Sequence, residues 1–333
     1  MPRARWGREN PTMRRLSSAF ASVVVGLLAS RAASASPVYV SLLTQGTIVR
    51  VDGSGSQSVY ASNLGAPGTL RLDSAGDLFV LDGVGKRVLK ILPNGTKTVF
   101  TTFLPSGNDI SSQELLVDAS GALFSIVQRG DIASQVWRLL AGAPPVLVAE
   151  ISGVSARGGT VGPDGEFYLA LQEGKVVRVT HGGQVSTFYA PPTSIQMIDV
   201  RFTSQGDLII LSPQSLWKVS GASLLLLAPA LLDGALQLAI DAHDRIFISG
   251  GGFGGGQGDG FIQTVDANGV LSTLGTFPGL GPVDDIDDSD FDVLPSAPQA
   301  IPALSEVGQS AAVLIFALML SARARRRQRV PLA

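Results

Sequence analysis

Short runs of alternating apolar and polar residues recur along the middle of the chain at a nearly constant spacing. Each unit contains a turn followed by an aromatic or aliphatic strand, and the markers of these strands lie 38 to 45 residues apart: Tyr39, Phe79, Phe124, Tyr168, Ile209 and Phe247. A second alternating strand follows in phase, at 48–51, 88–91, 136–139, 176–179, 216–219 and 262–265. Alternation with a period of two is typical of half-buried β-strands. The pattern therefore predicts an all-β fold built from six repeats.

The length of the repeat limits the architecture. About 42 residues hold four short strands and their turns without room for a long helix, which is the size of one propeller blade. We expect residues 36–295 to form a six-bladed β-propeller, and a seven-bladed ring with one degenerate blade is the alternative. The first unit lacks its inner strand, whereas the acidic segment 284–288 matches the inner-strand segment 70–73 in pattern. We therefore expect this C-terminal segment to complete the first blade and close the ring, which removes exposed edge strands.

The first residues of the inner strands form a ring around one mouth of the central channel of such a propeller. In register these residues are Thr69, Glu114, Gly158, Asp199, Gln237 and Asp284. Carboxylate and amide oxygens are the ligands that hard cations prefer, so Glu114, Asp199 and Asp284 are predicted to bind a metal such as calcium. Together with Gln237 they form the candidate ligand-binding ring. The alternative is that they are exposed strand-start residues in a solvated channel.

The repeats of residues 37–295 resemble those of NHL and SMP-30/gluconolactonase-type six-bladed propellers. Enzymes of the SMP-30 type hold a catalytic divalent metal in this part of the channel with acidic and amide ligands. The resemblance therefore implies a metal-dependent hydrolase or lactonase as one reading of the ring.

The other residues that could take part in catalysis or binding lie in sequence contexts that favour structural roles. A series of aspartates begins turns, where the carboxylate can accept hydrogen bonds from nearby backbone N–H groups: Asp73, Asp118, Asp241 and Asp288. His181 and His243 lie in turns without a hydroxyl or carboxylate partner at a spacing that suggests a catalytic triad. The glycine-rich stretch 250–260 has no Gly-Lys-Ser/Thr sequence after it, so we interpret it as a flexible loop rather than a phosphate-binding loop.

Composition narrows the class of partner. The chain contains no cysteine, which excludes disulfides, thiolate metal sites and a cysteine nucleophile. Residues 36–322 hold 14 basic and 26 acidic side chains, a net charge of −12. Nucleic-acid binding requires a basic surface, so we expect no nucleic-acid partner.

The N-terminal segment 1–35 has the organisation of a secretory signal peptide. Arg14 and Arg15 precede an apolar core at 19–29, and Ala33 and Ala35 provide the small residues of a signal-peptidase cleavage site. A start at Met13 would give a signal of more usual length. A retained N-terminal anchor is the alternative.

The C-terminal segment 301–333 combines a short motif, an apolar run at 308–322 and an arginine cluster at 323–329, after a linker at 296–300. The cationic cluster should hold this end in the cytoplasm, with the body of the protein outside. The motif resembles the IPTL-CTERM class of exosortase sorting signals, relatives of PEP-CTERM. The matching positions are Ile301, Pro302, Leu304, Ser305, Glu306 and Gly308, whereas Ala303 replaces a threonine and Val307 a tryptophan of the family pattern.

That resemblance implies a membrane-anchored precursor, processing by an exosortase-type protease, and a mature form at the cell surface or outside a Gram-negative bacterium. An ordinary C-terminal membrane anchor is the alternative. Exosortase-type systems are associated with exopolysaccharide production, so extracellular polysaccharide is the implied partner. We expect a non-enzymatic binding or biofilm-matrix protein, and the metal-dependent hydrolase is the competing hypothesis.

Overall fold

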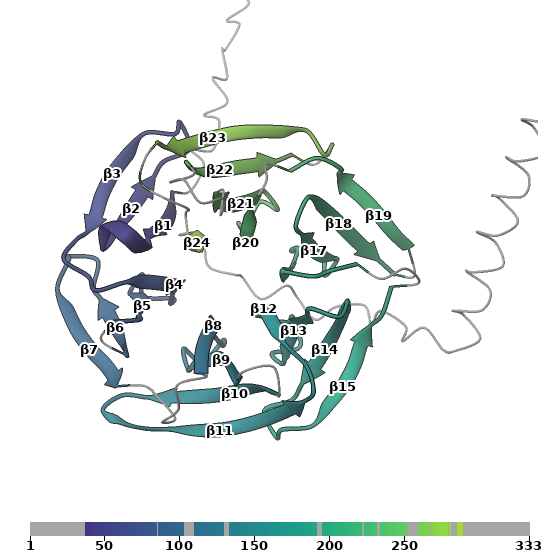
Figure 1. Cartoon of the computed structure of the whole chain (residues 1–333), viewed down its shortest axis with the longest axis horizontal. Coiled ribbons are helices and arrows are strands. Elements are labelled where there is room, and N and C mark those ends of the chain that lie inside the picture. The colour runs from purple at the N-terminus through teal and green to yellow at the C-terminus, as the bar shows by residue number, and fades with distance from the viewer. Residues whose placement is uncertain are drawn as a thin grey trace, which may run out of the picture. The chain divides into compact units, whose positions relative to one another are not determined.

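Six four-stranded antiparallel sheets surround a central axis, as Figure 1 shows in the computed structural model. The structure describes residues 37–288 except for 85, 103–109, 130–132, 192–194, 222, 232–233, 252–258, 267, 279 and 281–284. The predicted all-β six-bladed propeller is therefore confirmed, and the seven-bladed alternative is wrong. The predicted signal peptide, linker and sorting segment lie outside the described residues. Within the described part of the chain, no helix is both long and apolar enough to cross a membrane.

Five blades are formed by consecutive strands. Blade 2 comprises β4 (Pro67–Leu72), β5 (Leu78–Asp82), β6 (Arg87–Ile91) and β7 (Lys97–Thr102). Blade 3 comprises β8 (Ile110–Val117), β9 (Leu123–Arg129), β10 (Ala133–Leu140) and β11 (Ala143–Ser152). Blade 4 comprises β12 (Ala156–Val161), β13 (Phe167–Leu171), β14 (Lys175–Val179) and β15 (Val185–Tyr189). Blade 5 comprises β16 (Asp199–Phe202), β17 (Leu208–Ser212), β18 (Ser215–Ser220) and β19 (Ser223–Ala228). Blade 6 comprises β20 (Ala235–Ile240), β21 (Ile246–Gly251), β22 (Gly260–Val265) and β23 (Leu271–Phe277).

Blade 1 joins the two ends of the propeller and closes the ring. Its order is β24 (Asp285–Asp288), β1 (Val38–Leu42), β2 (Thr47–Val51) and β3 (Gln57–Ala61), with a 3₁₀ turn, η1 (Leu43–Gln45), after β1. The inner strand therefore comes from the C-terminal side of the domain, as the acidic segment predicted. Pairing of β1 with β24 supplies the backbone hydrogen bonds that an open ring would leave unsatisfied.

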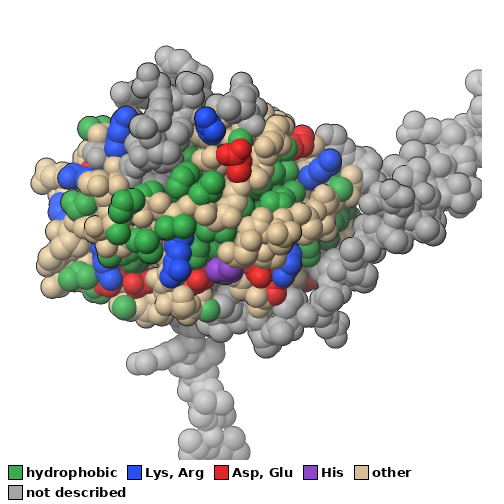
Figure 2. All heavy atoms as spheres, turned by 90° about the horizontal axis from the view of Figure 1, so that it is seen from below, with side chains coloured by type: hydrophobic (Ala, Val, Ile, Leu, Met, Phe, Trp, Pro, Cys, Tyr) green, Lys and Arg blue, Asp and Glu red, His purple; other side chains and the backbone are tan. Residues whose placement is uncertain are grey.

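The inner and second strands of a blade are more buried than its outer strand. In blade 4, four of the six residues of β12 and all five of β13 are buried, whereas the first three residues of the outer strand β15 are exposed. Apolar residues on the sheet faces pack against the next blade, and one buried apolar cluster lies in each of the six blade interfaces. Figure 2 shows the surface of one side of the ring: apolar side chains lie across its middle, and charged side chains lie along the lower edge and near the upper one.

The turns between inner and second strands are built by the aspartates that the sequence singled out. Asp73 Oδ1 accepts hydrogen bonds from the backbone nitrogens of Ala75 and Asp77, both at 2.9 Å. Asp118 and Asp241 accept the corresponding pairs of bonds in blades 3 and 6. The predicted structural role is confirmed for these three residues, whereas the side chain of Asp288 lies outside the described atoms.

Candidate functional site

The inner strands bring three of the predicted ring residues together at the centre of the propeller. Glu114 on β8 and Asp199 on β16 have no exposed surface, and Gln237 on β20 is 7% exposed. The alternative of exposed strand-start carboxylates in a solvated channel is therefore wrong for Glu114 and Asp199. Burial places these two carboxylates in a medium of low dielectric constant, where each needs a hydrogen-bonding or oppositely charged partner.

The fourth predicted member, Asp284, lies outside the described residues, and the register of β24 gives its ring position to a neighbour. Asp285 pairs with Ser41, just as Asp199 pairs with Leu211 in blade 5. The alignment of segment 284–288 was thus one residue out of register. Side chains alternate between faces of a strand, so a shift of one residue exchanges the channel face for the opposite face.

Arg71 on β4 is the first partner of the buried carboxylates. Its Nη2 donates to Glu114 Oε1 at 2.8 Å, and its Nη1 donates to Asp287 Oδ1 at 3.2 Å. The other oxygen of Asp287 accepts a hydrogen bond of 2.7 Å from the backbone nitrogen of Leu72. Blades 1, 2 and 3 are therefore joined by one guanidinium group.

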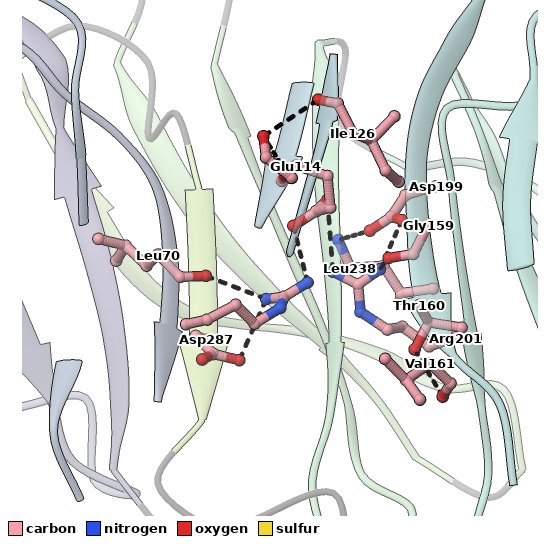
Figure 3. Close-up of polar contacts among 12 residues, drawn as sticks. Leu70, Glu114, Ile126, Gly159, Thr160, Val161, Asp199, Arg201, Leu238 and Asp287 are labelled. Carbon is pink, nitrogen blue, oxygen red and sulfur yellow. Dashed lines mark hydrogen bonds and ion pairs between the residues drawn. The ribbon is translucent and has the colours of Figure 1, made fainter. Parts of the chain in front are cut away.

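Arg201 on β16 is the second partner. Its Nη1 donates to Asp199 Oδ1 at 2.6 Å and to the carbonyl oxygen of Gly159 at 2.7 Å, and its Nη2 lies 3.7 Å from Glu114 Oε2. Figure 3 shows Glu114 between Asp287 on one side and Arg201 on the other, and the guanidinium of Arg71 donates to both Glu114 and Asp287. The sequence interpretation missed both arginines.

Gln237 links this network to the channel mouth. In the amide orientation that satisfies its hydrogen bonds, Nε2 donates to Asp199 Oδ2 at 2.9 Å and to Glu114 Oε2 at 3.3 Å. The backbone nitrogen of Leu238 donates to the same oxygen of Asp199 at 3.1 Å. We call Arg71, Glu114, Asp199, Arg201, Gln237 and Asp287 the central network.

Burial sets the protonation behaviour of the network. It raises the pKa of Glu114 to about 7, although the adjacent guanidinium groups of Arg71 and Arg201 act in the opposite direction. Burial also raises the pKa of Asp199, against the same two arginines. Glu114 therefore takes up a proton more readily than an exposed glutamate does.

The described residues of the ring do not fit a calcium ion. Calcium takes six to eight oxygen ligands, whereas Glu114 and Asp199 each have a guanidinium nitrogen within hydrogen-bonding distance. No cluster of three histidine, aspartate or glutamate side chains within the described ranges could hold a metal ion. The arginines occupy the place that the sequence interpretation assigned to a cation.

A pocket of about 420 Å³ opens above the network at the mouth of the channel. Its wall and floor come from blades 1, 2, 4, 5 and 6, with these described lining residues: Leu43, Ala66, Gly68, Thr69, Leu81, Gly83, Arg157, Gln196, Met197, Ile198, Leu236 and Gln237. Thr69 is 6% exposed, and its hydroxyl has no hydrogen-bond partner. Glu114 and Asp199 do not line the pocket. The described lining of the pocket is thus mostly apolar, and the buried carboxylates lie outside it.

His181 lies away from this pocket and has partners that the sequence did not reveal. Its Nδ1 lies 3.2 Å from Glu166 Oε2, its Nε2 lies 3.4 Å from Asp118 Oδ2, and its ring packs against Phe124 and Phe167. The contact ties the turn of Asp118 in blade 3 to blade 4, so the histidine joins two blades.

Comparison with known proteins supports the fold. No family model and no curated protein matches the chain, so the resemblance of segment 301–333 to a sorting signal stays a prediction. Among solved structures, a streptogramin B lyase is 13% identical over 72% of this chain and 78% of its own, with a TM-score of 0.52. A gluconolactonase from Xanthomonas campestris is 15% identical over 65% and 82%, with a TM-score of 0.53.

A protein of unknown function from Bacteroides caccae is 13% identical over 76% of this chain and 98% of its own, with a TM-score of 0.56. At these identities the likeness concerns the fold and not the activity. The chain is therefore an all-β six-bladed propeller of the architecture that gluconolactonases share.

Proposed function

We propose that this chain is an exported, non-enzymatic binding protein that takes a small polar ligand at the mouth of its central channel. One observation carries the proposal: the pocket of about 420 Å³ lies over carboxylates that arginines already neutralise. The volume falls within the range of small-molecule sites. The described lining includes the polar side chains of Gln196 and Gln237, which can bind a ligand by hydrogen bonding.

The complete burial of the Glu114 and Asp199 carboxylates supports binding rather than catalysis. A general acid or base must come within hydrogen-bonding reach of the group that it protonates or deprotonates. Glu114 and Asp199 have no exposed surface, and the side chain of Gln237 lies between them and the pocket. A ligand in the pocket meets the amide first.

The cellular location in which the protein would bind its ligand is inferred from the two ends of the sequence alone. The signal-peptide pattern of 1–35 and the sorting-signal pattern of 301–333 support export, temporary anchoring in the inner membrane and processing by an exosortase-type protease. Extracellular polysaccharide of the producing bacterium is then the available partner. Mass determination of the mature protein, from cells with and without the exosortase, tests this step. An intact C-terminus in both strains would refute the sorting signal.

A second experiment tests binding at the channel mouth. Leu43 lines the pocket and is 38% exposed, so Leu43→Trp should fill the mouth without disturbing the core. Val59 on the outer strand β3 is 66% exposed, and Val59→Trp is the matched control. We expect purified exopolysaccharide of the producing strain to bind the full-length chain and the Val59→Trp variant but not Leu43→Trp. Equal binding by all three proteins would contradict a site at the mouth.

A hydrolase or lactonase is the second candidate. The fold is shared with proteins described as gluconolactonases and a streptogramin B lyase, and Glu114 has a pKa of about 7, suited to acid–base chemistry. The full-length chain and its Glu114→Gln variant should be assayed for hydrolysis of glucono-δ-lactone. Hydrolysis that the variant loses by 100-fold or more would replace the binding proposal with this one.

A further inference from the structure

The outer strand of blade 5 differs from the outer strands of most other blades. In every blade, two exposed residues of the outer strand lie opposite the middle of the third strand. In four blades this pair includes a serine or a threonine: Ser58 and Val59, Thr98 and Val99, Ser186 and Thr187, and Ser272 and Thr273. In β19 the pair is Leu225 and Leu226, which are 52% and 47% exposed. Blade 5 therefore presents two large apolar side chains to solvent where most blades present a small hydroxyl group.

Blade 3 also carries two apolar residues at these positions, but its outer strand is protected against pairing. Val146 and Leu147 on β11 are 52% and 44% exposed. The same strand holds Pro144 and Pro145, which have no backbone N–H, and the exposed Glu150. Prolines and charges on an edge strand hinder the pairing of another strand with it. β19 contains neither a proline nor a charged residue.

β19 is also an edge strand whose backbone can pair with a partner. Within the described part of the chain it pairs only with β18, and it lies on the outside of the ring in Figure 1. The N–H and C=O groups on the outer side of such a strand are the groups that an added strand binds. The turn of blade 6 approaches one end of this edge, since a Cβ added at Gly269 would meet the carbonyl oxygen of Leu227. The segment for pairing is therefore Ser223–Leu226.

The sequence of β19 favours a second copy of the chain as that partner. A two-fold axis perpendicular to the sheet pairs two copies of one strand antiparallel and keeps each face of the sheet on its own side. If the axis passes at Leu225, it places Leu225 opposite itself and Leu224 opposite Leu226 of the other copy. Residues two positions apart share a face, so these pairs are apolar cross-strand contacts between leucines.

Charge also favours β19 over the rest of the surface. Residues 36–322 carry a net charge of −12, so two copies repel each other in general. A two-fold axis brings each charge toward its own counterpart, and like charges that lie directly opposite destabilise a strand pair. β19 holds no charge, and Lys218, which lies opposite Leu225 on β18, forms an ion pair of 2.5 Å with Asp207. Two copies can therefore meet at β19 without like charges opposite each other.

We propose that β19 is a self-association edge, through which two copies of this chain join their fifth blades into one eight-stranded antiparallel sheet. The described lining of the channel-mouth pocket contains no residue of β19, so this self-association goes beyond the proposed ligand binding and is independent of it. A four-residue edge with two half-exposed leucines buries far less surface than the roughly 1,600 Å² of a standard interface, so the dimer is weak and reversible.

Sedimentation velocity of the full-length chain at increasing protein concentration tests the dimer. The test variant is Leu225→Ser/Leu226→Thr, which gives blade 5 the serine–threonine pair of blade 6. The matched control is Val146→Ser/Leu147→Thr on β11. We expect the unmodified chain and the control to dimerise with a Kd of about 10–500 μM, since interfaces below the standard size are typical of transient complexes. The test variant should self-associate about ten-fold or more weakly, because a few central side chains supply most of the affinity of an interface.

Hydrogen exchange of the unmodified full-length chain locates the contact without any substitution. The amides of Ser223–Leu226 should exchange more slowly at protein concentrations well above the Kd than well below it, because pairing gives the outward N–H groups a partner. Higher salt should strengthen the dimer, since it screens the repulsion between two acidic copies. All three proteins carry the same chain ends, so a difference between them reports on the outer strands alone.

Any of four results would overturn the proposal. A chain that stays monomeric throughout the concentration range, or equal self-association of the test variant and the unmodified chain, would show that β19 does not join two copies. Slowed exchange outside β19 with none within it would place the contact elsewhere. Growth beyond the dimer would exclude a closed two-fold pair. None of these outcomes affects the exopolysaccharide experiment with Leu43→Trp, which tests the channel mouth by itself.

Discussion

Replacing Arg201 with methionine should destabilise the propeller more than any substitution on its surface. The guanidinium of Arg201 donates to Asp199 Oδ1 at 2.6 Å and to the carbonyl oxygens of Gly159 and Val200 at 2.7 and 2.9 Å. Methionine has a similar length but no donor. The substitution therefore leaves a buried carboxylate without its ion-pair partner and removes a hydrogen bond from a carbonyl of blade 4.

The size of the effect follows from burial. The side chain of Arg201 is 5% exposed and that of Asp199 is completely buried. Breaking a buried ion pair by removing one partner costs about 3–5 kcal/mol. For a domain of this size each kcal/mol lowers Tm by about 2–4 °C, so we expect a loss of about 4 kcal/mol and a fall in Tm of about 8–16 °C.

Urea denaturation and thermal scans of the full-length chain measure the loss, with Arg138→Met as the exposed control. The control should change the free energy of unfolding by less than about 0.5 kcal/mol. In the double variant Arg201→Met/Asp199→Asn the stranded charge is also removed, so the combined loss should be smaller than the sum of the two single losses. A loss below about 1 kcal/mol for Arg201→Met, or strict additivity in the double variant, would refute the ion-pair argument.

Three further predictions follow from the same structure. Burial raises the pKa of Glu114 from 4.5 to about 7, so between these values the folded chain retains a proton that the unfolded chain releases. The free energy of unfolding should consequently fall as pH rises from about 4.5 to 7, and Glu114→Gln should make it less dependent on pH. A stability that increases with pH in this window would contradict the raised pKa of Glu114. Millimolar calcium should leave Tm unchanged because arginines occupy the ring, and a rise that Glu114→Gln abolishes would show that the ring does bind metal. Gly174→Ala should destabilise the protein more than Gly165→Ala. Both glycines have positive φ, but only at Gly174 would the added Cβ meet a carbonyl oxygen, that of Ile195, at 2.6 Å. Equal losses of unfolding free energy in urea denaturation would show that this collision is relieved.

The sequence predicts the propeller because the pattern that indicates each blade is local and occurs six times. Each blade repeats the same alternation and the same turn, so an error in one unit is corrected by the other five. The closing strand was found in the same way, by its likeness to segment 70–73. Its register was not predicted, because the run 284–288 has aspartates on both faces and only one apolar residue, the buried Ile286, to distinguish them.

The central network was only half visible. The predicted ring took one residue from each inner strand, although side chains two positions apart lie on the same face of a strand. Arg71 follows Thr69 by two positions, and Arg201 follows Asp199 by two, so both arginines could have been placed on the channel face. Their partners could not, since Arg71 meets Asp287 across 216 residues of sequence and only the closed ring brings them together.

The same contact explains why the position of the predicted C-terminal sorting segment matters to the fold. Asp287 is the contribution of β24 to the central network, and it binds both Arg71 and the backbone of Leu72 in the neighbouring blade. The closing strand is therefore tied to blade 2 by charge as well as to β1 by backbone pairing. A cut within the predicted motif 301–308 would leave Asp287 and all of β24 in the propeller, whereas a cut before residue 285 would remove the partner of Arg71 and reopen the ring. Processing at the motif is thus compatible with a mature propeller that keeps both its channel and its network.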